Sequence, residues 1–309
     1  MSEQSPSVAV VRACLRDGTG GSPTAVMDEA PLSDDQRRRV PVLLGTSHAV
    51  FVSVDDRDGE PAVSLRFFTA EGELPACGHG TVAALAYLAG RAEDREFRAT
   101  LHTATRVFPG WSVREGTRIR AAFDPGPVEL REPTAAECDL VLPALGLTSA
   151  ALAPGIRVAA IGRQRLLIPL ASPATLAALA PDFARLRDAC DRLGFLGCYV
   201  HSVPTATGRV TARMFAPSIG VDEDIANANS TACLAAHLAT RGIADIAVDM
   251  GDSLGSPSTI TATTRDSPRT RIDLGGAAEV THTIDYACLT GSPPEYRWRR
   301  GHRADGSGR

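Results

Sequence analysis

A cysteine and a histidine lie two residues apart in the segment GELPACGHGT, residues 72–81, directly before an apolar run. Cys77 offers a thiol, and His79 offers an imidazole that exchanges protons near neutral pH. The flanking Gly78 and Gly80 allow a tight turn. These residue types are compatible with proton transfer, with cysteine nucleophilic catalysis, with metal binding, and with anion binding at a helix N-terminus.

Two of these interpretations lack residues that they need. A phosphate-binding loop of the Walker type requires a lysine, and the sequence contains none. A zinc site from Cys77 and His79 requires two further ligands, and none lies nearby in the sequence, so we expect no metal here. Nucleophilic catalysis by Cys77 stays open, as does a purely structural role for a small residue at a helix start. His79 at a helix mouth is well placed for proton transfer.

The segment belongs to a long internal repeat. Residues 62–91 and 210–242 each pass from an alternating strand-like stretch with Arg-x-Phe, through an acidic loop, into an alanine-rich apolar run. A repeat of this length predicts two halves of similar fold, at 1–127 and 151–286. The proline-rich segment 128–150 is expected to connect them.

The two apolar runs predict buried helices, near 80–91 and near 229–241, because each run is apolar on nearly all sides. We therefore expect an α+β fold in which each half is a curved, mostly antiparallel, barrel-like β-sheet around one central helix. Two such halves would direct both helix N-termini at a cleft between them. The free N–H groups and partial positive charge there favour a carboxylate.

The expected substrate-binding residues lie in the two loops that begin these helices. A small molecule with a carboxylate is the partner that such loops would bind. The residues are Cys77, Gly78, Gly80 and Thr81 in the first loop, and Asn227, Asn229 and Ser230 in the second.

Composition predicts a cytoplasmic protein. The net charge of -4, without a basic stripe, disfavours nucleic acid as a partner. No apolar run approaches the roughly 18 residues of a membrane span, and the N-terminal segment lacks the features of a secretory signal. Seven scattered cysteines without a CxxC pair indicate reduced thiols. The proline- and arginine-rich tail 287–309 is expected to be disordered.

Three ordered motifs resemble one known family. The segments FFTAEGELPACGHGT, LLIPLASPATLAALAPD and ARMFAPSIGVDEDIANANSTACLAAHL are similar to the PhzF-like isomerases of phenazine biosynthesis, members of the diaminopimelate-epimerase fold superfamily. The resemblance covers about residues 10–285. It implies two similar halves with the site between them, no metal or cofactor, and a homodimer. It also implies proton movement along an allylic system of a small unsaturated carboxylic or amino acid.

The resemblance assigns the catalytic residues one at a time. SHAVFV matches the segment that carries the family's catalytic glutamate, which places His48 at the glutamate position. The family's Gly-His loop matches His79, and an aspartate of its Glu-Asp-Pro-Ala-Thr-Gly-Ser segment matches Asp224. A histidine has an unperturbed pKa of about 6.5, so His48 can replace glutamate as a base. We expect His48 to move the proton on one face of the substrate, while His79 and Asp224 orient the substrate or relay a proton.

Two alternative functions stay open at this point. The superfamily also contains racemases and epimerases with two cysteines, of which Cys77 matches the first and Asn227 stands at the second. Loss of the family glutamate would also suit an inactive small-molecule-binding homologue. Asn229 replaces a serine that would contact the substrate, which favours an altered substrate. We expect a small unsaturated cyclic amino or carboxylic acid of natural-product biosynthesis, such as an alkylidene-proline precursor.

Overall fold

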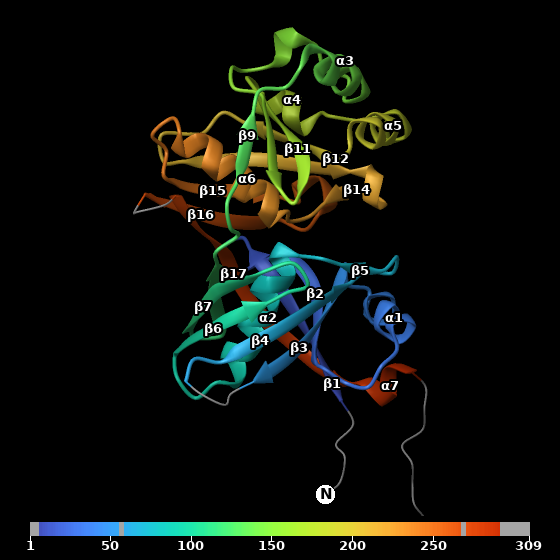
Figure 1. Cartoon of the computed structure of the whole chain (residues 1–309), viewed down its shortest axis with the longest axis vertical. Coiled ribbons are helices and arrows are strands. Elements are labelled where there is room, and N and C mark those ends of the chain that lie inside the picture. The colour runs from blue at the N-terminus through green and yellow to red at the C-terminus, as the bar shows by residue number, and fades with distance from the viewer. Residues whose placement is uncertain (1–5, 56–58, 267–269, 291–309) are drawn as a thin grey trace, which may run out of the picture.

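The computed structural model describes residues 6–55, 59–266 and 270–290, which form two lobes stacked along the long axis (Figure 1). The fold is mixed α+β, with mostly antiparallel strands that form a large, curved sheet. Among the described residues, every helix is too short or too polar to cross a membrane.

The first lobe contains the N-terminal strands and part of the last one. Its strands are β1 (Ser7–Leu15), β2 (Ser22–Asp28), β3 (His48–Asp55), β4 (Ala62–Phe68), β5 (Glu73–Leu74), β6 (Glu96–His102), β7 (Val107–Glu115), β8 (Arg118–Phe123) and the second part of β17 (Thr270–Asp285). The second lobe contains β9 (Glu129–Arg131), β10 (Arg157–Ile161), β11 (Arg163–Leu170), β12 (Phe195–Ser202), β13 (Arg209–Ala216), β14 (Val221–Asp224), β15 (Asp245–Met250), β16 (Ser258–Asp266) and the first part of β17.

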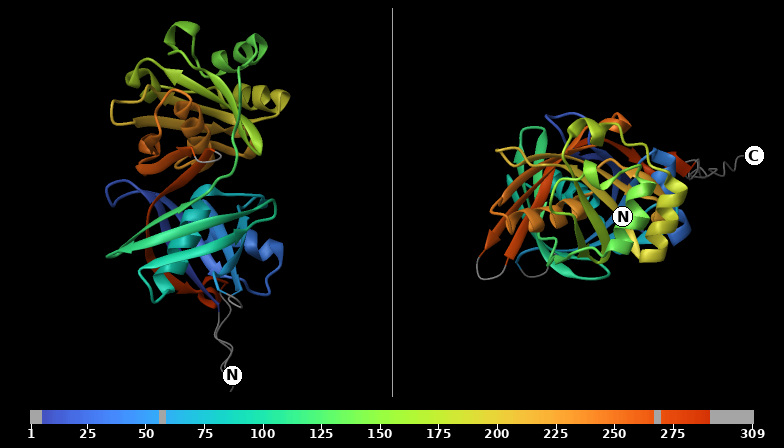
Figure 2. Two further views of the ribbon diagram at one scale, coloured as in Figure 1. Left: turned by 60° about the vertical axis from the view of Figure 1, so that its left-hand side comes forward. Right: turned by 90° about the horizontal axis from the view of Figure 1, so that it is seen from above.

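The helices differ in how deeply they are buried. They are α1 (Asp34–Leu44), α2 (Gly78–Arg91), α3 (Ala135–Ala144), α4 (Pro173–Ala177), α5 (Phe183–Leu193), α6 (Ala228–Ala239) and α7 (Tyr286–Thr290), with 3₁₀ turns at Ser149–Ala151, Pro217–Ile219 and Asp252–Leu254. Helices α1 and α7 lie on the outside of the first lobe, and α3, α4 and α5 on the outside of the second (Figures 1 and 2).

The strand pairings of the first lobe return to their starting point. The order is β1, β2, β3, β4, β6, β7, β8 and β17, and β17 pairs again with β1. Pairing is parallel between β2 and β3 and between β4 and β6, and antiparallel elsewhere in this order. In the second lobe, β10, β11, β12, β13, β15, β16 and β17 follow the same succession, with parallel pairs β11–β12 and β13–β15.

Helices α2 and α6 are the deeply buried helices of the described chain, and both pack against several strands. Every residue of α2 from Gly78 to Ala89 is buried, and the helix packs against β1, β2, β3, β7, β8 and β17. Helix α6 is buried from Ala228 to Leu238 except for the half-buried Asn229, and it packs against β10, β15, β16 and β17. One apolar cluster includes the inner residues of both helices. The small side chains of both runs let the strands approach closely.

Strand β17 links the lobes in a way that the sequence boundaries did not predict. Its first part pairs with β16, whereas its residues from Leu274 onward pair with β8 and then β1, down to the partners Ser7 and Asp285. The expected second half, 151–286, therefore supplies a strand to the first lobe. Figure 2 shows this strand running between the lobes.

The expected connection at 128–150 contains regular structure. Strand β9 pairs with β10, and α3 begins with a capping box in which Thr134 and Glu137 each accept the other's backbone N–H. Such a box is a start signal for a helix, and it outweighs the local prolines. The expected tail 287–309 begins inside α7, and its residues from 291 lie outside the described part of the chain.

The N-termini of α2 and α6 touch at Gly78. A Cβ atom added to Gly78 would lie 2.4 Å from Ala228 Cβ, which is closer than two carbon atoms can approach. We expect Gly78→Ala to destabilise the protein by about 1–3 kcal/mol, because the helix starts must separate. Thermal unfolding measures this effect. Gly90→Ala in the same helix is the control, because its Cβ would have 3.9 Å of space, and its stability should not fall.

Candidate active site

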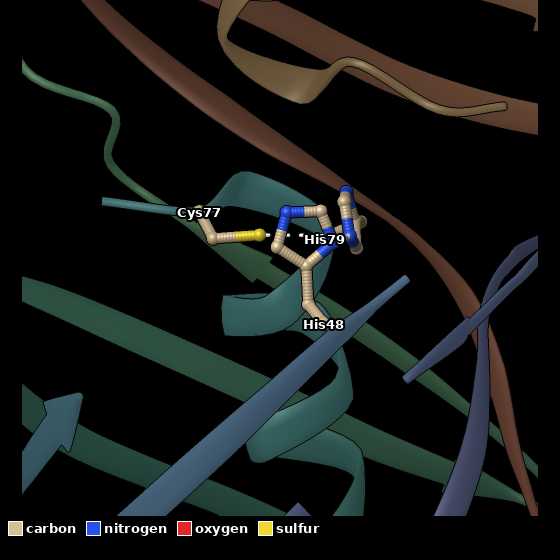
Figure 3. A group of neighbouring side chains, drawn as sticks. All are labelled: His48, Cys77 and His79. Carbon is tan, nitrogen blue, oxygen red and sulfur yellow. Dashed lines mark hydrogen bonds between the residues drawn. The ribbon is translucent and has the colours of Figure 1, made fainter. Parts of the chain in front are cut away.

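Three side chains predicted from the sequence meet at the start of α2 (Figure 3). His48 is the first residue of β3, Cys77 is the N-cap residue of α2, and His79 lies in the first turn. His79 Nε2 lies 2.9 Å from His48 Nδ1 and 3.5 Å from Cys77 Sγ. Cys77 and His79 are buried, and His48 is half-buried. The cluster therefore has one member that reaches toward solvent.

Local structure explains how these side chains converge. Strand β3 starts at His48, whose register partner on the parallel strand β2 is the buried Thr24. Cys77 makes no side-chain cap hydrogen bond, so its thiol is free to face the histidines. A Cβ atom at Gly80 would lie 3.0 Å from Cys77 Sγ and 3.1 Å from the Phe67 ring. Glycine at position 80 thus leaves room for the sulfur.

A backbone carbonyl fixes the tautomer of His79. His79 Nδ1 lies 3.0 Å from the carbonyl oxygen of Ala226 in the loop before α6. Because a carbonyl oxygen can only accept a hydrogen bond, Nδ1 carries a proton and donates it. Nε2 is therefore the nitrogen that gains and loses a proton, and it is the atom that faces His48 and Cys77. The same bond ties the α2 start to the α6 loop.

The cluster shifts the pKa values of two of its members in opposite directions. Burial raises the pKa of Cys77, but the charges of His48 and His79 and their hydrogen bonds outweigh it and lower the pKa to about 5. Burial lowers the pKa of His79, whereas the Cys77 thiolate, the charge of Asp224 and the Ala226 carbonyl raise it to about 9. Both shifts favour a thiolate on Cys77 beside an imidazolium on His79.

The Asp224 carboxylate accepts hydrogen bonds from two residues of the loop before α6. One carboxylate oxygen accepts the Ala226 N–H at 3.2 Å, and the other accepts the Asn227 side-chain amide at 3.0 Å. Asn227 in turn caps α6 by accepting the Ser230 N–H at 2.9 Å. The negative charge of Asp224 also acts on His79. Asp224 therefore positions the Ala226 carbonyl and stabilises the His79 imidazolium.

The remaining predicted substrate-binding residues differ in what they offer. Buried Thr81 donates its hydroxyl to the Cys77 carbonyl at 2.8 Å, and the side chain of buried Ser230 accepts from Arg165 at 3.2 Å. Among the described residues, Asn229 has no side-chain hydrogen-bond partner, and it is half-buried at the start of α6. Asn229 is thus the side chain of the second loop that is available to a ligand.

Arg165 and the Ala226 carbonyl were missed by reasoning from the sequence. Arg165 is 1% exposed and lies beneath the α6 start, where its guanidinium also donates to the carbonyls of Ile161 and Arg163. No spacing rule marks a lone arginine in a strand as a buried neighbour of a helix 65 residues away. A backbone carbonyl has no sequence signal at all.

Three side chains that could bind a metal ion lie together although they are separated in the sequence. Among the described residues, one donor atom each from His48, Cys77 and His79 lie within 4.8 Å of one another. The sequence predicts no zinc site here, because no further ligand lies near Cys77 and His79 in the chain. The third donor comes from β3, 31 residues before His79, and the pairing of β3 inside the first lobe brings it to the helix start.

Comparison with known proteins places this chain in a family. The family model of phenazine biosynthesis-like proteins, PhzC–PhzF, matches residues 13–283. An uncharacterised isomerase of Salmonella typhimurium is 27% identical over 87% of this chain and 93% of that protein. The trans-2,3-dihydro-3-hydroxyanthranilate isomerase of Pseudomonas aeruginosa is 32% identical over 74% of this chain and 78% of that protein. A solved structure of a predicted epimerase from Pseudomonas aeruginosa superposes with a TM-score of 0.78, at 26% identity, over 91% and 99% of the two chains.

Proposed function

Because the chain belongs to the PhzC–PhzF family and its curated relatives are named isomerases, we propose that this isomerase moves a proton along an allylic system of a small unsaturated acid. The substrate that we propose is a cyclic amino or carboxylic acid of a natural-product pathway, such as an alkylidene-proline precursor. The reaction needs no cofactor, because the proton-transfer groups are side chains of the protein. The observation that carries the proposal is the contact between His48 and His79 beside the Cys77 sulfur.

His48 is the base in this mechanism, through Nε2. When His79 is neutral, its Nε2 accepts the Nδ1 proton of His48 across 2.9 Å, so His48 Nε2 is free to take a proton from the substrate carbon. As His48 takes that proton, its Nδ1 proton moves to His79 Nε2. The Cys77 thiolate stabilises the imidazolium that forms. Reversal of these steps returns a proton to the other end of the allylic system on the same face.

In our proposal, the N-terminal ends of α2 and α6 bind the negative charge of the substrate. The first N–H groups of α2 and α6 lack partners within their helices, and they carry partial positive charge. In our proposal the N–H groups that remain free of cap hydrogen bonds, together with Asn229, bind the carboxylate of the substrate and the negative charge that develops when the proton leaves. The contact between Gly78 and Ala228 supports this arrangement, because it brings the two helix starts together.

We also propose that the lobes are pseudo-symmetric halves, each with one central helix, and that only the first half carries the base. The repeated strand succession supports this. Phe68 pairs with Ala49, and Phe215 pairs with Cys198, so the position equivalent to His48 is Gly197. A side chain at Gly197 would meet the Phe215 carbonyl oxygen at 2.0 Å. The residue equivalent to Cys77 is Asn227, the N-cap of α6. One base therefore has to perform both transfers.

Proton NMR in D₂O tests the proposal. The purified protein, kept in a chelator, is incubated with a panel of unsaturated cyclic amino and carboxylic acids, and deuterium uptake and double-bond position are followed together. We expect deuterium uptake together with a shifted double bond for at least one compound. If a compound binds but no compound exchanges, the protein is a binding homologue and the proposal is wrong.

A racemase or epimerase is the second candidate, and the thiolate of Cys77 favours it. A thiolate can take a proton from a carbon as well as stabilise an imidazolium. Asn227 at the equivalent position cannot return a proton on the opposite face, because a side-chain amide is not an acid. The same NMR experiment separates the candidates, because a racemase exchanges the proton and inverts the centre without moving the double bond.

A further inference from the structure

We propose that His48, Cys77 and His79 form a zinc-binding site, with His48 Nδ1, Cys77 Sγ and His79 Nε2 as the three protein ligands. The site goes beyond the isomerase function and does not depend on it. All three donor atoms lie within 4.8 Å of one another, and the half-buried His48 gives the ion a path from solvent. Figure 3 shows the Cys77 sulfur and both imidazole rings gathered beside the start of α2.

The two donor distances that involve His79 Nε2 lie near those around a tetrahedral zinc ion. Zinc bonds of about 2.0–2.1 Å to nitrogen and about 2.3 Å to sulfur place two nitrogens about 3.3 Å apart, and a nitrogen and a sulfur about 3.6 Å apart. His79 Nε2 lies 2.9 Å from His48 Nδ1 and 3.5 Å from Cys77 Sγ. Side-chain rotations that widen the distance between the two nitrogens would admit the ion.

A second, independent feature is the support behind His79. Histidines that bind metals commonly donate their other ring N–H to a carbonyl or carboxylate, which fixes the ring and the tautomer. His79 Nδ1 donates to the Ala226 carbonyl in this manner, which leaves Nε2 for the ion. The Ala226 N–H is itself held by Asp224. The ring is therefore oriented for coordination before any metal arrives.

The donor set selects the kind of metal. Two imidazole nitrogens and one thiolate suit zinc and related transition metals, whereas magnesium and calcium prefer oxygen donors. Three protein ligands leave the fourth position for water or an anionic ligand. A bound ion would occupy the nitrogens between which the proposed proton relay runs. Zinc is therefore expected to inhibit the isomerase, and a chelator to restore it.

Cobalt(II) titration of the full-length, chelator-treated protein tests the site without any substrate. Cobalt takes the same tetrahedral geometry as zinc and reports a thiolate ligand through a charge-transfer band in the near ultraviolet. We expect one cobalt per chain, visible tetrahedral bands, a thiolate band, and displacement by zinc. Cys77→Ser should abolish the thiolate band, and His48→Ala should weaken zinc binding by on the order of 100-fold or more.

Two control variants distinguish metal binding at this site from metal binding by other cysteine and histidine side chains. Cys288→Ser removes an exposed thiol and His102→Ala removes a histidine that pairs with Ser64 outside the cluster, and both variants should bind cobalt like the wild type. Circular dichroism checks that each variant folds. A thiolate band that survives in folded Cys77→Ser, unchanged zinc affinity in His48→Ala, or no band in the wild type would overturn the site. Because no step requires turnover, an inactive isomerase that binds cobalt would contradict only the proposed function.

Discussion

Replacing His48 with alanine is expected to lower the rate of deuterium uptake by the substrate by about 100- to 10,000-fold, the range that one general base contributes. In the proposed mechanism His48 Nε2 is the atom that takes the proton, and alanine has no group that can accept it. His48→Gln should lose as much, because an amide can form hydrogen bonds but cannot accept the proton. Deuterium uptake followed by NMR at saturating substrate measures both variants.

His102→Ala is the control for this experiment. His102 pairs with Ser64 of β4, and Ser64 pairs with Ser53 of β3, so two strands and several residues along β3 separate His102 from His48. The deuterium exchange rate of the His102→Ala variant should equal that of the wild type. A folded His48→Ala protein with full exchange activity would remove His48 from the mechanism and leave the Cys77 thiolate as the candidate base.

Changing Cys77 to serine is expected to move the pH dependence of kcat/KM. In the wild type, a protonated His79 directs an N–H at His48 Nδ1, and two N–H groups cannot face each other at 2.9 Å. His48 then holds its proton on Nε2 and cannot act as a base. Because the thiolate raises the pKa of His79 to about 9, kcat/KM should fall about tenfold per pH unit below that value.

Serine does not ionise in this range, so Cys77→Ser removes the charge that raises the pKa of His79. The acidic limb of the profile should therefore shift to lower pH. The kcat/KM of the variant relative to that of the wild type should rise as the pH falls. Cys288→Ser, which alters an exposed thiol, should keep the wild-type profile. The measurement is kcat/KM against pH in the presence of a chelator. An unshifted limb in folded Cys77→Ser would show that the thiolate does not act on the base.

Much of the site was predictable because local patterns encode it. The alanine-rich runs after Cys77 and Asn227 indicated buried helices, and the structure begins α2 at Gly78 and α6 at Ala228. Motif order and spacing pointed to the family, which the match over residues 13–283 confirms. These features depend on residues close together in the chain. Hydrophobic periodicity and cap residues are sufficient to find them.

Long-range pairing explains what the sequence did not reveal. Strand β17 changes partners along its length, from β16 to β8 and β1, and no local pattern marks that exchange. The thiolate state of Cys77 depends on His48, which only the register of β3 brings to the helix start. The Ala226 carbonyl that orients His79 is a backbone atom. Charge and tautomer thus depend on tertiary contacts that residue types alone cannot specify.

The most direct measurement of the central claim, that Cys77, His79 and His48 hold protons as one unit, is nitrogen-15 NMR of the histidine rings during a pH titration. The protein is labelled at histidine and kept in a chelator, and His79→Asn assigns the signals. We expect His79 to keep its proton on Nδ1 throughout and to lose the Nε2 proton near pH 9 in the wild type, but at lower pH in Cys77→Ser. If the His79 ring titrates near the ordinary pKa of about 6.5 in both proteins, the claim that these three residues hold protons as one unit is wrong.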